Sequence, residues 1–442
     1  MSATLSPPPS SSATAAARGA AATAPDVLDN WLATQSLNLA RHAKSIRRFE
    51  PGEFGKGPEA PSEAHLEAAN KFIDRYKDRV IEIARSVEAA VAIARREPSP
   101  GRLHVMLERK DAVSQRVLYV EGLWDFFFDL FVQRLSKFGE RLRAVDRIGA
   151  NCYEDLYVGM GSAQPTPRLL PYSYAQSGFG PLTLRRGVPV TKLRRQANPF
   201  PLVVIPQHRL ANVWALSSVL HEVSHNLQAD VGLWNRIPRE LFARLTAELR
   251  LPEPIAAIWA HWHKEIMADM LALVFGGPGA IESLMDVVGR APGNTVRFIP
   301  GAVHPTPFLR VFINTLLLRR LGLGRMADGI DRAWQRLYPR VTEDDIPPSL
   351  LSTFRAAAEM VIDTMIFQPY DQLAGKSVAQ IVPFGPAQMQ MIGQGARLLA
   401  SGSDAAAIPP RFMIGAARYA LDRRLATPET ITENFYRTLG RR

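Results

Sequence analysis

Most of the chain has the hydrophobic spacing of α-helices. From Glu63 to Glu97, apolar residues recur at steps of three and four positions, which predicts one long amphipathic helix that ends at Pro98. The same spacing predicts further helices over 25–49, 102–118, 120–145, 210–229, 255–274, 307–321, 326–337 and 350–365, and two more near the C-terminus. This pattern predicts a mainly α-helical protein.

One region departs from helical spacing. Between Gly159 and Pro199, Gly, Pro, Ser and Gln are frequent, which indicates a small β-sheet or extended loops. The run Phe200–Pro206 that follows is rich in β-branched residues and reads as a strand. Because prolines stand at both ends of this run, we expect it at the edge of its sheet.

The chain lacks the sequence features of a membrane or secreted protein. No run reaches the roughly 18 apolar residues of a membrane span, and the N-terminus shows no basic region followed by an apolar core. Residues 1–25 are rich in Ser, Ala and Pro and predict a disordered tail, with an organelle transit segment as the alternative. We therefore expect a soluble, cytoplasmic protein with no membrane span.

Charge and cysteine content narrow the chemistry. The net charge is +11, but the basic residues are spread along the chain without a run of five, so we expect a basic surface and not a nucleic-acid partner. A basic groove for nucleic acid stays as a further hypothesis. The single cysteine, Cys152, can form neither an internal disulfide nor a cysteine-based zinc cluster. Any metal site must therefore use histidines and carboxylates.

A metal-binding pattern lies within one predicted helix. His221-Glu222-Val223-Ser224-His225 reads HExxH, and its two histidines are four residues apart, so they project from one helical face and can hold the same ion. The apolar stripe that supports the helix consists of Leu216, Leu220, Val223 and Leu227. Two imidazoles with an open position suit Zn²⁺, and Glu222 lies where it can take a proton from a zinc-activated water.

A second predicted helix carries candidates for the third ligand. Glu265 and Asp269 share one helical face, so Glu265 can ligate the metal while Asp269 accepts the ring N–H of a ligand histidine. His261 and His263 are rival third ligands in the same segment. The HExxHxxGxxH arrangement is excluded, because Gln228 and Val231 occupy the positions of its glycine and third histidine.

The combination of HExxH with ExxAD on a second helix resembles the gluzincin class of zinc metallopeptidases. His304-Pro305 and Arg310 add an HPxxxxR pattern, which is similar to a segment of the CaaX-prenyl-protease and HtpX group. The resemblance implies that His304 donates to the substrate carbonyl oxygen as it becomes an oxyanion, and that Arg310 orients His304 or the substrate backbone. It also implies a peptide bound as an added strand at a sheet edge, for which the segment Pro201–Pro206 is the candidate. It covers only about Phe200 to Leu321, and it departs from that group in lacking membrane-spanning helices.

Together these patterns predict a mainly α protein with a small β-sheet, in which a zincin-like core is flanked by helical regions. The expected divisions are a tail over 1–25, an N-terminal helical region over 26–150, a metallopeptidase core over 151–323 and a C-terminal helical region over 324–442. The expected activity is zinc-dependent hydrolysis of peptide or protein substrates, by Glu-assisted attack of a zinc-activated water. The alternative is a non-catalytic helical binding or scaffold protein that retains a metal site.

Overall fold

The chain divides into two compact units. The structure, a computed structural model, describes residues 26–161, 165–342 and 344–440. One unit consists of the chain up to Arg47 with Asp74–Glu121, and the other of Arg48–Ile73 with Gly122 onward. The boundaries expected near residues 150 and 323 fall inside the second unit and stay predictions. The tail expected over 1–25 lies outside the described residues.

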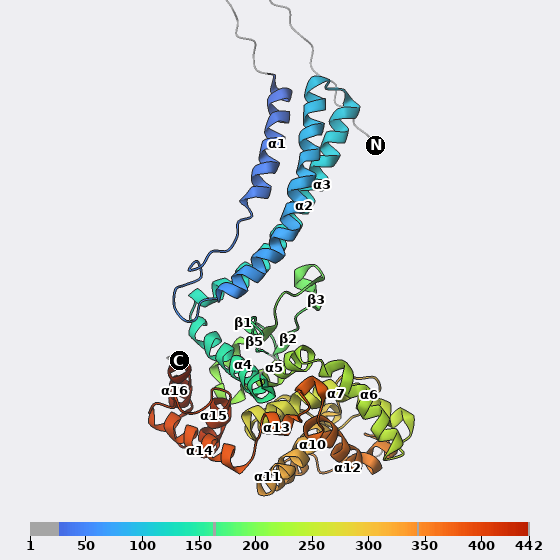
Figure 1. Cartoon of the computed structure of the whole chain (residues 1–442), viewed down its shortest axis with the longest axis vertical. Helices are drawn as coiled ribbons and strands as arrows, with labels where there is room; N and C mark the ends of the chain where they lie inside the picture. Colours follow the sequence, from blue (N-terminus) through green and yellow to red (C-terminus); the bar gives the residue numbers. More distant parts are fainter. Residues whose placement is uncertain (1–25, 162–164, 343, 441–442) are drawn as a thin grey trace, which may run out of the picture. The chain divides into compact units, whose positions relative to one another are not determined.

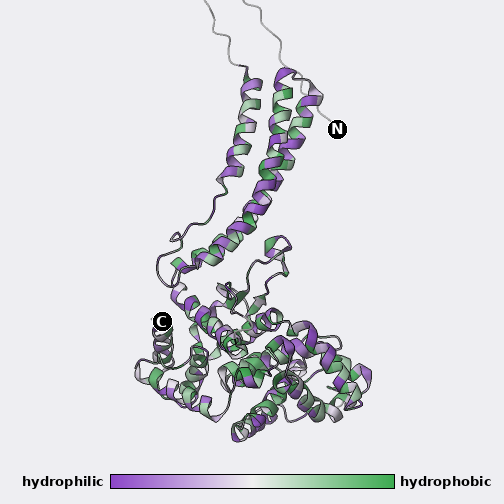
Figure 2. Ribbon diagram, viewed as in Figure 1, coloured by the Kyte–Doolittle hydropathy of each residue, from purple (hydrophilic) through white to green (hydrophobic). Residues whose placement is uncertain are grey.

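Three helices supply the first unit (Figure 1). They are α1 (Val27–Ser45), α2 (Glu63–Arg96) and α3 (Pro100–Val132), of which α2 and α3 continue into the second unit. Arg95 on α2 pairs with Asp29 on α1, with Nε 2.5 Å from Oδ1. Figure 2 shows hydrophilic and hydrophobic residues interleaved along α2 and α3, as the sequence pattern predicts.

The prediction of two helices over 102–118 and 120–145 is wrong. One helix, α3, runs through to Val132, and the break comes at 133–138, before α4 (Gly139–Met160). No proline interrupts the chain between 101 and 164, so nothing near residue 119 ends the helix. The turn at the break fits a glycine at position 139, because a Cβ there would lie 2.3 Å from the Arg134 carbonyl oxygen.

Helices make up most of the second unit, and the mainly α class is confirmed. After α4 they are α5 (Ser217–Asp230), α6 (Leu233–Ala247), α7 (Glu253–Gly276), α8 (Gly279–Val288), α9 (Pro292–Thr295), α10 (Pro307–Arg320), α11 (Gly324–Leu337), α12 (Pro348–Ile362), α13 (Val378–Ile381), α14 (Pro386–Ser401), α15 (Phe412–Asp422) and α16 (Pro428–Gly440). The helix predicted over 210–229 begins later, at Ser217, after two short 3₁₀ turns. No helix among the described residues is long and apolar enough to cross a bilayer.

The sheet is small and mixed, and it corrects one expectation. Its order is β1 (Tyr172–Gln176), β5 (Leu202–Pro206) and β2 (Leu182–Leu184), with β5 parallel to β1 and antiparallel to β2. The strand predicted at residues 200–206 exists, but it is central and not at the edge. The prolines leave only its ends without an N–H, while its interior keeps the donors that a central strand needs. A separate hairpin pairs β3 (Pro189–Val190) with β4 (Gln196–Ala197).

Helices α5 and α7 pack against each other in the core of the second unit. The stripe predicted on α5 is buried, with Leu216, Leu220, Val223 and Leu227 each at most 1% exposed. The opposite face of α5 carries the histidines. Burial of the stripe therefore sets the rotation of α5 and turns the HExxH residues toward α7.

Candidate metal centre

The two HExxH histidines bring their ring nitrogens together. His221 Nε2 and His225 Nε2 are 3.1 Å apart, and the ring centroids are 4.6 Å apart with the ring planes almost perpendicular. Both side chains are largely buried on α5. Burial lowers the pKa of His225 to about 4, so this imidazole is neutral near pH 7, as a metal ligand must be.

Glu265 on α7 completes a group of three donors. Its Oε2 lies 3.4 Å from His221 Nε2 and 3.7 Å from His225 Nε2. This oxygen is buried and accepts no hydrogen bond from the described residues. A buried carboxylate oxygen without a hydrogen-bond partner, facing imidazole nitrogens, fits a metal ligand. His221, His225 and Glu265 could therefore hold a metal ion.

The rival third ligands do not join this group. His263 is buried, and both of its ring nitrogens are used, one on the Ala260 carbonyl and the other on that of Trp234. His261 lies on an exposed part of α7. Of the three candidates that the sequence left open, the structure brings only Glu265 to the two histidines of α5.

Asp269 and Arg310 orient one ligand. His221 Nδ1 lies 2.8 Å from Asp269 Oδ1, which leaves Nε2 to face the other donors. Burial alone would raise the pKa of Asp269, but the Arg310 guanidinium and His221 lower it overall, so the carboxylate is ionised. Burial likewise opposes the charged form of His221, but Asp269 and Glu265 outweigh it and raise its pKa to about 10. Metal binding at neutral pH must therefore displace a proton from His221.

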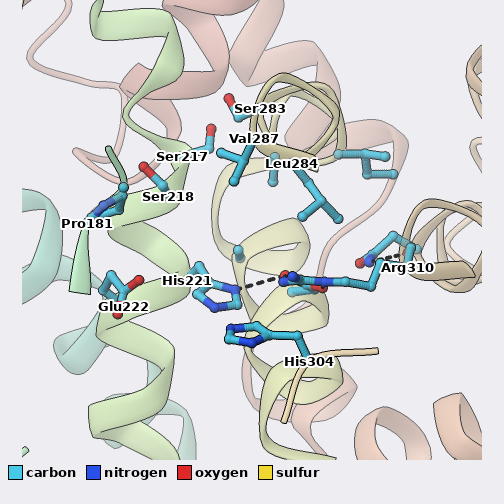
Figure 3. Close-up of a pocket in the computed structure, with 16 residues that line it drawn as sticks. Pro181, Ser217, Ser218, His221, Glu222, Ser283, Leu284, Val287, His304 and Arg310 are labelled. Carbon is cyan, nitrogen blue, oxygen red and sulfur yellow. Dashed lines mark hydrogen bonds and ion pairs between the residues drawn. The ribbon is translucent and has the colours of Figure 1, made fainter. Parts of the chain in front are cut away.

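Glu222 faces a pocket beside these donors. A cavity of about 160 Å³ opens there, and Figure 3 shows Glu222, His221 and His304 toward one end and Ser217, Ser218 and Ser283 toward the other. Glu222 is 8% exposed, and burial raises the pKa of its carboxyl group to about 7. A carboxylate with a pKa near neutrality is suited to accept and return a proton.

His304 and Arg310 both line the same pocket. His304 precedes α10, its side chain is 63% exposed, and its Nε2 lies 3.2 Å from Glu265 Oε2. The Arg310 guanidinium makes two hydrogen bonds to Asp269, so it acts on His221 through that carboxylate. The expected roles of His304 and Arg310 toward a substrate stay predictions.

Several pocket residues escape sequence reasoning. The apolar wall comes from α8 through Ile281, Leu284 and Val287, and Gly180 and Pro181 lie on the segment before β2. Nothing in the sequence pattern links α8 to the HExxH helix, because the pairing depends on the packing of α7, α8 and α10. Gly276 and Gly277, which follow the helix predicted over 255–274, are a local signal that the chain turns there.

Comparisons with known proteins give no relative: no protein-family model, no curated protein and no solved structure matches the chain.

Proposed function

We propose that the chain is a zinc-dependent metallopeptidase with a zincin-like core. The observation that carries the proposal is the spacing of the three donor atoms, at 3.1, 3.4 and 3.7 Å from one another. Zinc–nitrogen and zinc–oxygen bonds of about 2.0–2.2 Å in a tetrahedral arrangement separate neighbouring ligand atoms by about 3.3–3.6 Å. Two imidazoles and one carboxylate are also a ligand set that leaves a fourth position for chemistry.

The surrounding residues fit hydrolysis. A zinc ion held there would supply Lewis acidity, which activates water and polarises a peptide carbonyl. Asp269 holds His221 in the tautomer that presents Nε2. Glu222, buried at the pocket, would accept a proton from the attacking water and return it to the leaving amine. His304, exposed at the pocket, would donate to the developing oxyanion, the role that its HPxxxxR context implies.

A peptide or protein substrate fits the sheet next to this centre. β2 is an edge strand, and the segment before it lines the pocket through Gly180 and Pro181. Asn226 Nδ2 donates to Thr183 Oγ1 at 2.7 Å, which ties β2 to α5 one residue after the second HExxH histidine. An extended peptide can add to such an edge through main-chain hydrogen bonds, so β2 takes the place in substrate binding that the sequence assigned to the segment at 201–206.

The test compares zinc content and peptide hydrolysis in the full chain. Wild type should bind about one zinc and cleave members of a defined peptide mixture, followed by mass spectrometry. Glu222→Gln should keep zinc and lose cleavage by about a hundred-fold or more, whereas His221→Ala and Glu265→Ala should lose zinc. Glu253→Gln, at the exposed start of α7, is the matched control and should behave as wild type.

The same experiment distinguishes the metallopeptidase from the alternative, a non-catalytic binding or scaffold protein. If zinc binds but neither wild type nor Glu222→Gln cleaves any peptide, a non-catalytic binding protein with a metal site is the better description. If no metal binds when zinc is supplied, the donor group is not a metal centre and the proposal fails.

A further inference from the structure

Two cations flank one indole ring beside the metal centre. The Arg185 guanidinium carbon lies 3.7 Å from the centroid of the Trp234 ring, and Lys264 Nζ lies 5.6 Å from the same centroid. Trp234 in turn lies against a metal-ligand candidate, with its ring centroid 6.1 Å from that of His225. Arg185 directly follows β2, and Lys264 directly precedes Glu265 on α7, so the two positive charges come to Trp234 from different elements.

Among the described residues, neither Arg185 nor Lys264 has a carboxylate partner. Within the part of the chain that the structure describes, no Asp or Glu oxygen pairs with Arg185 or Lys264 within 4.0 Å. The neighbouring Arg186, in contrast to Arg185, does have partners: it donates to the Leu169 carbonyl and lies 4.0 Å from Asp230. Arg185 is half-buried, and burial without a compensating carboxylate lowers its pKa. A half-buried guanidinium in this position favours an anion supplied from outside the chain.

The local sequence supports a preference for negative charge. From residue 156 to 221, the segment that contains the whole sheet and reaches the first HExxH histidine, there is no Asp or Glu. Its basic residues are Arg168, Arg185, Arg186, Lys192, Arg194, Arg195 and Arg209. The edge strand β2 therefore lies in a stretch that carries positive charge only, which attracts acidic peptides and repels basic ones.

We infer that Arg185 and Lys264, with Trp234 between the metal centre and the end of β2, form a carboxylate-binding subsite for the peptide substrate. The inference rests on the proposed function for the identity of the ligand as a peptide. Trp234 holds the Arg185 guanidinium by stacking and leaves its N–H groups free along the edge of the plane. A peptide added along β2 would bring its own carboxylate to this cation, either from an acidic side chain or from its C-terminus.

The structural alternative is that Arg185 and Trp234 stack only to pack the end of β2. Binding of defined peptides to the zinc-loaded full chain with Glu222→Gln distinguishes the two, because this variant should leave the peptide intact. The probes are alanine-rich octapeptides with one Glu moved along successive positions, their Gln counterparts, and the same peptides with a free or an amidated C-terminus. Equilibrium binding is measured by fluorescence polarisation at two salt concentrations.

In one of these matched pairs, Glu against Gln or a free against an amidated C-terminus, we expect the peptide with the carboxylate to bind about ten-fold more tightly than its amide counterpart at low salt. A preference at one Glu position identifies an acidic side chain, and a preference for the free terminus identifies the C-terminal carboxylate. Arg185→Gln should abolish the preference, Lys264→Gln should reduce it, and Arg185→Lys should restore part of it. Arg195→Gln removes the same charge from the exposed β3–β4 hairpin and should leave the preference intact.

The inference is overturned if no peptide binds, if no pair is distinguished, or if the preference survives in folded Arg185→Gln. Its failure is separable from that of the proposed function. If the wild type hydrolyses peptides but shows no carboxylate preference, the inferred subsite is wrong and the proposed peptidase activity stands. If the preference depends on Arg185 but the wild type hydrolyses no peptide, the proposed peptidase activity is wrong and the carboxylate-binding site stands.

Discussion

Arg310 donates two hydrogen bonds to the carboxylate of Asp269, from Nε to Oδ2 and from Nη2 to Oδ1, each 2.8 Å long. Asp269 in turn lies 2.8 Å from His221 Nδ1. Three largely buried groups on α10, α7 and α5 therefore form a continuous chain that ends at a donor residue of the candidate metal centre. An arginine that does not touch the metal can thus affect how tightly it is held.

Replacing Arg310 should weaken metal binding. In Arg310→Gln the buried Asp269 loses its countercharge and holds His221 less firmly, so we expect zinc affinity to fall about 10–100-fold and the protein to lose about 3 kcal/mol of stability. The zinc affinity of Arg310→Lys should lie between those of wild type and Arg310→Gln. The measurement is competition for zinc with a chromophoric chelator, on protein shown to be folded by circular dichroism.

The control for this change is Arg319→Gln on the same helix. Arg319 pairs with Asp328 and Asp331, at 2.8 and 2.5 Å, on the partly exposed side of α10. Its replacement should leave zinc affinity unchanged. Unchanged zinc affinity in folded Arg310→Gln would show that the Asp269 chain does not act on the ligand.

Removal of the metal should destabilise the second unit. A ligand that binds only the folded state stabilises it by about 2.7 kcal/mol at a free concentration one hundred times its Kd. We therefore expect a chelator to lower the Tm of zinc-loaded wild type and to have no effect on His225→Ala. His208→Ala changes an exposed histidine outside the donor group and should keep the wild-type response. An equal chelator effect on all three proteins would contradict the site.

A methyl group added at Gly415 should disturb the packing of α15 against the end of α7. A Cβ on Gly415 would lie 2.2 Å from the Gly276 carbonyl oxygen, a backbone atom that cannot turn aside. Gly415→Ala should therefore cost about 2–3 kcal/mol of unfolding free energy. Urea denaturation monitored by far-UV circular dichroism measures this change.

Gly329 provides the matched control, because it is an exposed helical glycine on α11. Apart from its chain neighbours and the adjacent backbone of its own helix, no atom of the described residues would lie within 4 Å of the added Cβ. Gly329→Ala should stabilise the protein by up to about 1 kcal/mol, since alanine has the higher helix propensity. If both variants lose the same stability, the close approach of Gly415 and Gly276 is not what limits that position.

One partly buried carboxylate should make stability depend on pH. Glu282, Asp286 and Asp422 share a single guanidinium, that of Arg418, at 3.2, 2.7 and 3.2 Å. Burial, together with the neighbouring Asp422, raises the pKa of Glu282 to about 7. Because the pKa is higher in the folded state, the contribution of Glu282 to stability is fully present below about pH 4.5 and is lost as the pH rises through 7.

Glu282→Gln should therefore become more stable relative to wild type as the pH rises from 5 to 8, by about 1–2 kcal/mol. The measurement is the difference in unfolding free energy between variant and wild type across this range. Glu359→Gln changes an exposed ion pair with Arg355 and should show no such trend. A difference that stays constant with pH in Glu282→Gln would mean that Glu282 is ionised throughout.

Local patterns in the sequence determined most of the helices and the identity of the candidate ligands. The four-residue spacing of His221 and His225 places both on one helical face whatever surrounds them, and the apolar stripe on the opposite face predicts which side is buried. The expected ExxAD residues, Glu265 and Asp269, follow the same helical geometry. These statements depend on 3.6 residues per turn, which the chain carries within a single element.

Only the tertiary structure decided how these elements meet. Glu265 rather than His261 or His263 faces the α5 histidines because the packing of α7 against α5 sets its rotation, and His263 is used by two carbonyl groups. β5 is central and β2 is the edge because strand order depends on pairing between distant segments, which prolines at the ends of β5 do not prevent. The stacking of Arg185 on Trp234 likewise joins the residue that follows β2 to a residue of α6. Periodicity describes one helix or strand at a time, whereas long-range packing selects which faces and edges come together.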